Sequence, residues 1–366
     1  MPCDPTAVRA SFRIGRRSSG GHARHIACLN AVNEITVVLV SWRDAAEALD
    51  AVESLAQARR QILPAGPRVS LVVVDNGAGA LDREAVFAKW PDASLLVNES
   101  NRGFGPAANQ AAEVAAGDVL LFVNPDTRAE GEPFSGIARA FESRPDVVAV
   151  APRLIDWVQR SRFKVQGGTG GRLTPPGHED QFTFQLRRLP RLRDDARELL
   201  LLDHLAPNNR ARRRFRYADR DPEVPLGVEQ AAAAALAVRT SVFRAVGGFD
   251  ESFAPAWFED VDLCARLAEH GSILYWPDAR FRHRGSVSAE SLGYARFLPI
   301  FYRNALRYRR RRYGWLARTA YRALLVTGMV LRLAALPLRH GVPRSRTEAA
   351  HAYLRTLAVA LGVTRR

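Results

Sequence analysis

Five short runs of apolar, largely β-branched residues follow one another through the first 150 residues, and they restrict the possible folds more than any other feature. The runs are residues 35–41, 70–75, 94–97, 118–124 and 146–151. The stretches between them that have helical patterns are residues 44–61, 82–90, 105–116 and 132–143. Strands that are apolar on both faces are typical of a parallel sheet covered by helices. The sequence therefore predicts an α/β fold with a doubly wound, mostly parallel sheet.

Polar residues follow these strands, at the edge where ligands bind in open α/β sheets. They include Ser41, Asp75, Asn76, Asn124 and Asp126. The carboxylate of Asp75 can accept hydrogen bonds from a base or a ribose, although Asp-Asn-Gly is equally an ordinary turn sequence. A single carboxylate at Asp126 suits Mg²⁺ or Mn²⁺, which take one or two carboxylates together with phosphate oxygens. The alternative is that Asp126 caps the next turn.

A glycine-containing loop opens the predicted helix of residues 105–116. It reads NRGFGPAANQAA over residues 101–112. Free amides at a helix start, with an arginine nearby, suit a ligand that carries phosphate. The loop contains neither GK[ST] nor G-x-G-x-x-G, so by itself it does not identify a ligand class.

Five carboxylates lie among aromatic residues in the stretch GGFDESFAPAWFEDVD, residues 247–262. They are Asp250, Glu251, Glu259, Asp260 and Asp262. Aromatic residues beside acids indicate a pocket wall with a proton acceptor or a metal ligand. The alternative is a surface loop leading into a helix, because acids in a first helical turn are favoured by the helix dipole. His283 follows in RFRHRGSVS, and together with Asp126 and a phosphate it is a candidate ligand of an Mn²⁺-like ion.

Charge is distributed very unevenly along the chain. The formal net charge is +15, and residues 301–366 hold fifteen arginines and one acid, which leaves the body close to neutral. A neutral body argues against nucleic acid as the partner. We expect a disordered basic tail at 1–32, one domain at 33–290 with a variable insertion at 155–227, and a helical, arginine-rich extension at 291–366.

The apolar part of this extension, residues 323–338, is too short and interrupted to predict a membrane span. It fits a helix that lies on an anionic membrane surface, and the alternative is a core-packed helix with a solvated basic face. The three cysteines lack disulfide or zinc spacing, and the first 30 residues lack a secretory pattern. These features predict a cytoplasmic protein, peripheral on the inner face of the membrane.

Eight motifs in order resemble the family 2 inverting glycosyltransferases of the GT-A fold, with the closest likeness to bacterial rhamnosyltransferase-like members that build cell-wall and surface polysaccharides. The motifs are TVVLVSW (36–42), VVVDNG (72–77), NRGFGPAANQAA (101–112), GDVLLFVNPDT (117–127), AVAPRL (149–154), GGFDESFAPAWFEDVDLCARLAEHG (247–271), YWPDARFRHRGSVS (275–288) and FYRNALRYRRRRYG (301–314). The resemblance covers about residues 34–314.

The resemblance implies a role for each matching residue. Asp260 is expected to be the general base, and Trp257 and Glu259 to shape the acceptor pocket. Asp126 and His283 are expected to bind a divalent cation, Mn²⁺ or Mg²⁺. The expected nucleotide-sugar-binding residues are Ser41, Asp75, Asn76, Asn101, Gly103, Asn109 and Asn124.

Two positions depart from the family pattern. Asn124 replaces the first acid of the D-x-D motif, which leaves fewer acidic metal ligands. Ala233 stands where the family usually has glycine near the acceptor, and its methyl group narrows that site. The second departure weakens any inference about the acceptor.

The implied reaction transfers a sugar, rhamnose or another hexose, from a nucleotide-diphosphate sugar to a hydroxyl of a glycan or of a polyprenyl-diphosphate-linked acceptor. One alternative is a sugar nucleotidyltransferase, but such enzymes carry a glycine-rich loop after the first strand, where this chain has SWRDAAEALD. Another is a non-catalytic homologue in an assembly complex, against which the retention of Asp126, Asp260 and His283 argues.

Overall fold

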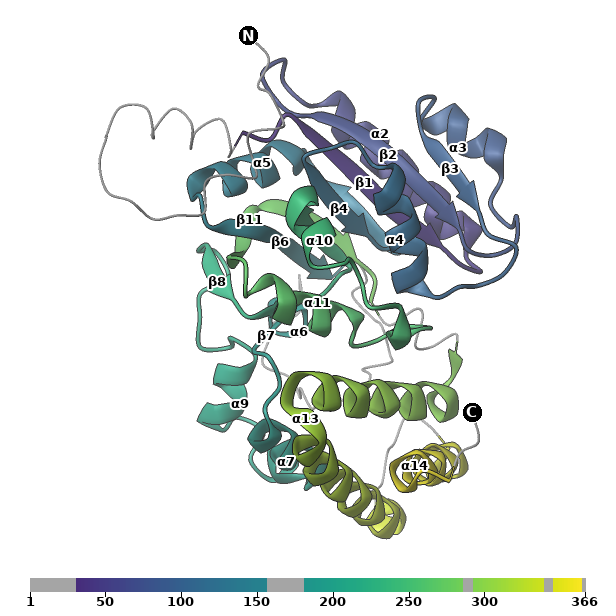
Figure 1. The fold of residues 1–366 in the computed structure, drawn as a ribbon, viewed down its shortest axis with the longest axis vertical. Coiled ribbons are helices and arrows are strands. Elements are labelled where there is room, and N and C mark those ends of the chain that lie inside the picture. Colours follow the sequence, from purple (N-terminus) through teal and green to yellow (C-terminus); the bar gives the residue numbers. More distant parts are fainter. Residues whose placement is uncertain (1–30, 157–180, 286–291, 339–344, 364–366) are drawn as a thin grey trace.

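A computed structural model of the protein describes residues 31–156, 181–285, 292–338 and 345–363. A nine-stranded sheet lies at the centre of this part of the chain, in the order β3-β2-β1-β4-β10-β6-β11-β5, with β8 paired to β11 (Figure 1). The strands are β1 (Glu34–Ser41), β2 (Arg68–Asp75), β3 (Ser94–Val97), β4 (Val119–Val123), β5 (Thr127–Glu130), β6 (Val147–Asp156), β8 (Leu226–Val228), β10 (Ala235–Arg239) and β11 (Ser272–His283).

Most strands of this sheet run in one direction. β3, β2, β1 and β4 pair in parallel, and so do β6 and β11. β10 is antiparallel to both β4 and β6, so β6 points the same way as β4. β5 and β8 are antiparallel to β11. The predicted α/β fold with a mostly parallel sheet is therefore confirmed.

Helices cover both faces of the sheet because its strands are apolar on both sides. Within β1, Val37 and Leu39 face one core, whereas Val38 and Val40 face the other. The first core is closed by α2 (Ala45–Arg60), α3 (Arg83–Lys89) and α5 (Phe134–Ser143). The second is closed by α4 (Phe104–Val114), α10 (Thr240–Ala245) and α11 (Glu259–Leu267).

A helical layer lies beside the carboxyl edge of the sheet, at the bottom of Figure 1. It consists of α7 (Leu192–Leu199), α8 (Leu202–Leu205), α9 (Arg210–Phe215), α13 (Tyr294–Ala334) and α14 (Arg346–Leu361). Of these helices, α7, α13 and α14 share a third core, which includes Leu199, Tyr302, Leu325 and Tyr353. Gly314, with φ of 84°, interrupts α13 and divides it into two helical arms. The predicted C-terminal helical extension is present.

One buried ion pair ties the insertion to the C-terminal helices. Arg309 of α13 donates from Nε to Oδ2 of Asp195 in α7 at 3.0 Å, and its second nitrogen contacts Oδ1. Arg332 also donates to the backbone oxygen of Leu199 at 2.7 Å. A charged pair can be buried when each partner offsets the desolvation of the other. The arginines of this layer therefore serve partly as structural contacts.

The sequence also predicts an irregular insertion with some helix-like basic stretches at 155–227 and a short strand at 273–276, and the structure corrects both. The described part of the 155–227 insertion is not irregular: it forms α7, α8 and α9, together with α6 (Phe182–Gln185) and β7 (Leu186–Arg187), which pairs with β9 (Gln230–Ala231). The strand expected at 273–276 continues to His283, because its register shifts between Trp276 and Arg280 and the pairing then resumes. Residues 1–30 and 157–180, where a tail and part of the insertion were expected, lie outside the described residues.

Two further features of the sequence are resolved. The composition of the alanine-rich stretch 231–235 and of the LAVR that follows suits either a strand or a helix; in the structure β9 ends at Ala231, residues 232–234 turn, and β10 begins at Ala235. In the described residues, no helix combines the length and the apolar character that crossing a membrane requires.

Candidate active site

Ser41 and Asp75 lie opposite each other at the carboxyl ends of β1 and β2. The backbone N–H of Asn76 donates to the backbone oxygen of Ser41 at 2.8 Å, and the backbone N–H of Asn98 donates to the backbone oxygen of Asp75 at 2.8 Å. The Asp75 carboxylate accepts the backbone N–H groups of Gly77 and Leu81, each at 2.8 Å. These bonds hold the loop after β2 in a fixed shape, and the base contact expected of Asp75 stays a prediction.

Asn76 holds the loop of residues 98–103 through its side-chain amide. Its Nδ2 donates to Asn101 Oδ1 at 2.9 Å and to Gly103 O at 3.2 Å. Its Oδ1 accepts from Asn98 Nδ2 at 3.0 Å and from Arg102 N at 3.1 Å. A primary amide has two donors and two acceptor sites, so the protein itself uses all four. Asn76 therefore positions the loop, and its predicted contact with the nucleotide sugar has no support in these bonds.

Gly103 and Asn109 bring the glycine loop against the acidic stretch. Gly103 has φ of 91°, and a Cβ atom there would meet the oxygen of Pro255 at 3.0 Å. Asn109 accepts from Phe249 N at 2.8 Å and donates to Phe249 O at 2.8 Å. Asn109 also donates to Glu251 at 3.2 Å. Both residues were predicted to bind the nucleotide sugar; in the structure their contacts join two loops, and the binding role stays a prediction.

His283 and Asp126 come together where β11 pairs with β5. Both side chains are buried, and Nε2 of His283 lies 3.4 Å from Oδ1 of Asp126. Burial acts to raise the pKa of Asp126, but the hydrogen bond and charge that His283 supplies in its protonated form outweigh it and hold that pKa below its usual value. The structure thus unites the two residues that the sequence analysis assigned to one metal site, although β11 and β4 are far apart in the chain.

Gln181, which the sequence analysis did not single out, fixes the orientation of the histidine ring. Its Nε2 donates to the backbone oxygen of His283 at 2.8 Å, so its Oε1 faces Nδ1 of the ring at 2.7 Å. An amide oxygen only accepts, so Nδ1 carries the proton of the neutral ring. Nε2 then presents its lone pair toward Asp126. An outer acceptor on the distal nitrogen is the usual arrangement behind a metal-binding histidine.

This pair fits a divalent cation with few protein ligands. A carboxylate oxygen and an imidazole lone pair side by side are two acceptors, and a cation between them removes their repulsion. Carboxylate with imidazole suits Mn²⁺, and diphosphate oxygens and water complete such a shell. No cluster of three or more acidic, histidine or cysteine ligands exists among the described residues. A cation held by this pair would therefore take its other ligands from outside these residues.

α11 begins within the acidic stretch, and its first turn carries Glu259, Asp260 and Asp262. Trp257 and Phe258 both adopt positive φ, of 72° and 75°, which turns the chain sharply before the helix. Non-glycine residues in this conformation are strained and persist only where the surroundings enforce it. Such strain is frequent at functional sites.

Asn304 of α13 supplies part of that enforcement. Its side chain is fully buried, and its Nδ2 lies 2.6 Å from Phe253 O, 2.9 Å from Ala256 O and 3.0 Å from Trp257 O. The indole of Trp257 packs edge-to-face on Phe297 with ring centroids 4.7 Å apart. The helical layer therefore holds the loop that precedes Asp260. Asn304 belongs to the motif at 301–314, but the sequence analysis assigned it no role.

Asp260 lies next to the backbone that supports the metal-binding edge. The N–H of Ala233 lies near this carboxylate and acts to lower its pKa, while Ala234 O accepts the N–H of Asn124 at 3.0 Å. Two consecutive alanines thus connect Asp260 with the Asn124-Pro125-Asp126 turn. The prediction that residues far apart in sequence share one site is consistent with this contact, and the roles of the individual side chains stay predictions.

The environment of Asp260 and Glu259 favours their neutral forms. Burial raises the pKa of Asp260, and the N–H of Val261 and the charge of Arg187 offset this only in part. Burial and the neighbouring Asp260 carboxylate raise the pKa of Glu259. Oε2 of Glu259 is buried and has no hydrogen-bond partner among the described residues. The acceptor-pocket role expected of Glu259 stays a prediction.

Arg187 and Gln230 also surround Asp260, and sequence reasoning found neither. They lie opposite each other in the β7–β9 pair, and Gln230 Nε2 is 3.4 Å from Asp260 Oδ2. Arg187 comes from the insertion, whose sequence had no recognisable pattern. Its contact with the acidic stretch depends on how the insertion folds back, which no local pattern encodes.

Residues 36–217 match the family model of Glycosyl transferase family 2. The chain belongs to this family. Over 239 residues it is 26% identical to the N-acetylglucosaminyl-diphospho-decaprenol L-rhamnosyltransferase of Mycobacterium tuberculosis, a match that covers 60% of this chain and 68% of that protein. Its likeness to family 2, expected from the eight motifs, is confirmed.

A second curated relative and a solved structure are also similar. The glucosyl-dolichyl phosphate glucuronosyltransferase of Haloferax volcanii is 32% identical over 96 residues, which span 26% of this chain and only 31% of that relative. The mannosyltransferase of Pyrobaculum calidifontis, solved with GDP-Man and Mn²⁺, aligns with a TM-score of 0.48 and 14% identity over 90% of this chain and 86% of the other.

Proposed function

We propose that this family 2 glycosyltransferase transfers a sugar from a nucleotide-diphosphate sugar to an acceptor hydroxyl with inversion, using Asp260 as general base and a divalent cation. The observation that carries the proposal is the connection of Asp260, through Ala233 and Ala234, to the turn that holds Asp126. One carboxylate with a raised pKa and one with a lowered pKa, on neighbouring elements, suit proton transfer and cation binding respectively.

In the proposed reaction the acceptor oxygen forms a bond to the anomeric carbon while its proton passes to Asp260. The bond from that carbon to the diphosphate breaks, and the electron pair leaves with the nucleoside diphosphate. Attack from the face opposite the leaving group inverts the configuration of the anomeric carbon. The raised pKa of Asp260 makes its ionised form a stronger base than an ordinary aspartate.

The cation would be Mn²⁺ or Mg²⁺, held by Asp126 and His283. When bound, it supplies Lewis-acid stabilisation of the charge that develops on the diphosphate. Gln181 keeps Nε2 of His283 unprotonated and directed at the site. The closed amide network around Asn76 holds the glycine loop in place for the donor.

We propose a polyprenyl-diphosphate-linked sugar as the acceptor and rhamnose or another hexose as the transferred sugar. The printed name of the mycobacterial relative describes a rhamnosyltransferase whose acceptor is N-acetylglucosaminyl-diphospho-decaprenol. Such an acceptor is anionic and anchored in a membrane, which matches the arginine-rich helical layer. This role would place the enzyme in cell-wall or surface polysaccharide synthesis.

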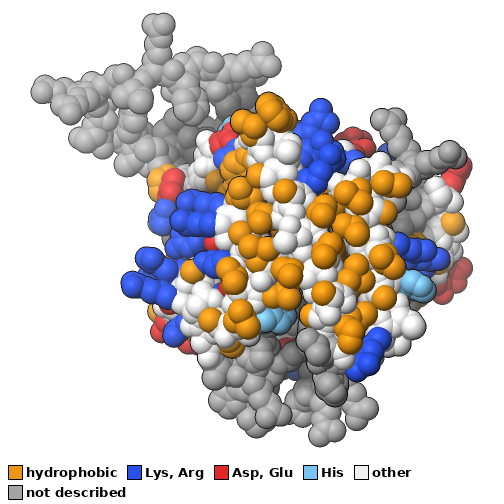
Figure 2. Space-filling view, turned by 90° about the horizontal axis from the view of Figure 1, so that it is seen from below, with side chains coloured by type: hydrophobic (Ala, Val, Ile, Leu, Met, Phe, Trp, Pro, Cys, Tyr) orange, Lys and Arg blue, Asp and Glu red, His pale blue; other side chains and the backbone are white. Residues whose placement is uncertain are grey.

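The membrane-facing surface would be the lower end of the molecule in Figure 1. Seen from below, apolar side chains cover a broad central area, with Lys and Arg side chains toward its margin (Figure 2). Exposed large apolar residues on the helices of this layer are Leu192, Leu202, Leu205, Tyr313, Trp315, Leu316, Val330, Leu331, Leu354 and Leu361. An apolar face with basic residues around it suits peripheral attachment to an anionic inner membrane surface.

The proposal is tested by incubating the purified protein with a panel of labelled nucleotide sugars and membrane lipid, with Mn²⁺ or with EDTA. We expect transfer that depends on the metal, with inversion of the anomeric configuration visible by NMR of the product. Transfer that is insensitive to EDTA would overturn the metal assignment. Failure of every donor with every lipid fraction would favour a non-catalytic homologue.

A further inference from the structure

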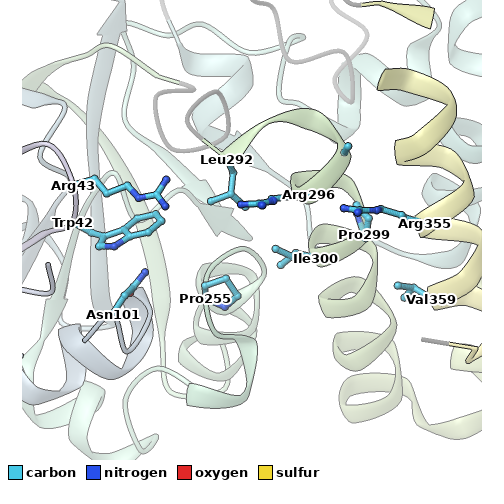
Figure 3. Close-up of a pocket in the computed structure, with 11 residues that line it drawn as sticks. Trp42, Arg43, Asn101, Pro255, Leu292, Arg296, Pro299, Ile300, Arg355 and Val359 are labelled. Carbon is cyan, nitrogen blue, oxygen red and sulfur yellow. The ribbon is translucent and has the colours of Figure 1, made fainter. Parts of the chain in front are cut away.

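A cavity of about 560 Å³ lies between the carboxyl edge of the sheet and the two C-terminal helices (Figure 3). It falls in the size range of pockets that bind small organic ligands. Its lining residues are Trp42, Arg43, Asn101, Pro255, Leu292, Ala295, Arg296, Pro299, Ile300, Arg355 and Val359. The proposed reaction uses only the periphery of this cavity, at Asn101 and Pro255.

The charged groups of the cavity are all cationic. Arg43 follows β1, Arg296 lies on α13 and Arg355 on α14, so three separate elements contribute them, and no acid is among the lining residues. Within the described ranges, none of these three guanidinium groups has an ion-pair partner. Guanidinium groups beside apolar surface are stabilised by an anion that binds them, and phosphate groups match their geometry.

Three other arginines, all on α13, form ion pairs with acids of the protein, unlike the three of the cavity. Arg309 pairs with Asp195, Arg312 with Glu269, and Arg311 with Asp250. The fold therefore provides acids for arginines that hold α13 to the rest of the protein. The cavity arginines lack such acids and are exposed, as is Arg310 of α13, so their charge is open to solvent and to an anionic ligand.

The rest of the cavity is apolar. Seven of its eleven lining residues are Trp, Pro, Leu, Ala, Ile or Val. Asn101 is the one uncharged polar side chain among them, and its Oδ1 already accepts from Gly103 N and Asn76 Nδ2. A nucleoside needs acceptors as well as donors for its base and ribose, and Asn101 is the only lining side chain with an acceptor oxygen. A ligand with an anionic head and a hydrocarbon body fits better.

One helix, α14, is shared by the cavity and the exposed apolar surface of the helical layer. α14 contributes Arg355 and Val359 to the cavity, while Leu354 and Leu361 of the same helix are 52% and 57% exposed. The same helix thus lines the cavity and carries exposed apolar side chains, against which a hydrocarbon chain longer than the cavity can lie. On the opposite side Pro255 belongs to the loop held by Asn304, five residues before Asp260.

We propose that this cavity binds the diphosphate and the first isoprenoid units of a prenyl-diphosphate-linked acceptor, with Arg43, Arg296 and Arg355 around the diphosphate. The inference rests on the proposed function and assigns to its acceptor a binding site. The ligand class follows from the combination of three unpaired guanidinium groups, an apolar lining and exposed apolar side chains on α14.

The test measures binding and does not depend on catalysis. A fluorescent short-chain prenyl diphosphate is titrated into the full-length protein and into the double variant Arg296→Gln/Arg355→Gln. The matched control is Arg310→Gln, which removes a charge from α13 outside the cavity. Each lost charge-assisted contact weakens binding by about tenfold. We expect the double variant to bind at least tenfold more weakly and the control to bind like the unmodified protein.

Ile300→Trp is a second variant that fills the apolar part without changing charge. It should also reduce prenyl-diphosphate binding while leaving the affinity for inorganic diphosphate unaltered, because the arginines remain. Equal loss with the control variant, or no loss with either cavity variant, would overturn the proposal. Competition by phosphatidylglycerol vesicles as strong as by unlabelled prenyl diphosphate would indicate a general lipid surface and would also overturn it.

Donor binding separates this inference from the function it rests on. Nucleoside diphosphate affinity is measured on the same variants by calorimetry. A parallel loss of nucleotide affinity would assign the cavity to the donor and refute the acceptor site, while the transferase proposal would stand. Intact prenyl-diphosphate binding in a protein that transfers no sugar would support the site and refute the transferase activity.

Discussion

At the carboxyl edge of the sheet, side-chain amides hold the loops through hydrogen bonds to the protein itself. In the C-terminal helical layer, an ion pair between charged side chains has this structural role. The side-chain amides of Asn76 and Asn109 form hydrogen bonds with neighbouring backbone groups and side chains. Arg309 is neutralised by Asp195, but the cavity arginines are left without acids. The protein's own hydrogen bonds therefore hold the loops at this edge, whereas the cavity arginines have no ion-pair partner among the described residues.

The largest expected effect concerns Asp260, where the two regions meet. Asp260→Asn keeps the size of the side chain but removes its capacity to take a proton. We expect kcat to fall by about 10²–10⁴-fold, the usual contribution of a general base. The matched control is Asp262→Asn, two residues further along the chain, whose carboxylate pairs with Arg266. Unchanged turnover by a folded Asp260→Asn protein would remove Asp260 from the mechanism.

The second prediction tests whether the amide of Gln181 prepares the metal site. Gln181→Ala removes the acceptor behind His283, so the ring is no longer held with Nε2 toward Asp126. Loss of such an outer contact typically lowers metal affinity by about 10–100-fold. The measurement is Mn²⁺ binding followed by electron paramagnetic resonance, with Gln57→Ala as the surface control. Equal Mn²⁺ affinity in both variants would contradict a metal site at His283.

The third prediction tests the attachment of the acidic loop to the helical layer. Asn304→Ala leaves three backbone oxygens without their donor in a buried place. Buried groups without partners cost about 1–3 kcal/mol each, so we expect the free energy of unfolding in urea to fall by at least that amount. The acceptor KM should rise too, because the loop contributes Pro255 to the cavity. A change in stability alone would limit Asn304 to a structural role.

The smallest effect concerns pH. Asp260 has a raised pKa, and the base works only when ionised, so kcat/KM should decrease as pH falls through that raised value. The charge of Arg187 lowers this pKa, so Arg187→Gln should move the acidic limb of the profile to higher pH. The control is Arg188→Gln, whose guanidinium pairs with Glu229 instead. A limb that stays in place would show that Arg187 does not act on the base.

The raised pKa values also determine the direction in which folding stability changes with pH. The pKa of Asp260 and that of Glu259 are raised in the folded protein. Folding stability from such groups is fully present below their unfolded pKa and is lost as pH rises through the folded values. Glu259→Gln should therefore lessen the loss of stability toward alkaline pH, which urea unfolding at several pH values measures. An identical pH dependence in the variant and the unmodified protein would contradict the raised pKa of Glu259.

Much of the sheet could be read from the sequence because each strand has a local signature. Continuous apolar runs must be buried on both faces, and alternation with helices leaves few topologies. The short β5 was missed because three of its four residues, TRAE, are polar and the strand pairs with one neighbour only. The long β11 was underestimated because Pro277 and a register shift interrupt its pattern.

The site was predictable in part for a related reason. Asp126 and His283 each stood in a recognisable motif, and the structure brings them to 3.4 Å. Gln181, Arg187 and Gln230 stood in no motif, since their importance comes from which side chain they reach after the insertion folds back. Asn109 looked like a ligand contact in the motif, yet its bonds go to Phe249 and Glu251.

By itself the sequence determined the α/β fold, the family and the concentration of positive charge at the C-terminus. These are consequences of local patterns: apolar runs, spaced motifs and composition. The tertiary structure decided which arginines are neutralised, which tautomer His283 adopts and where an apolar cavity remains beside Asn101 and Pro255. Such features depend on contacts between residues far apart in the chain, and the burial and pairing of a charge exist only after those contacts form.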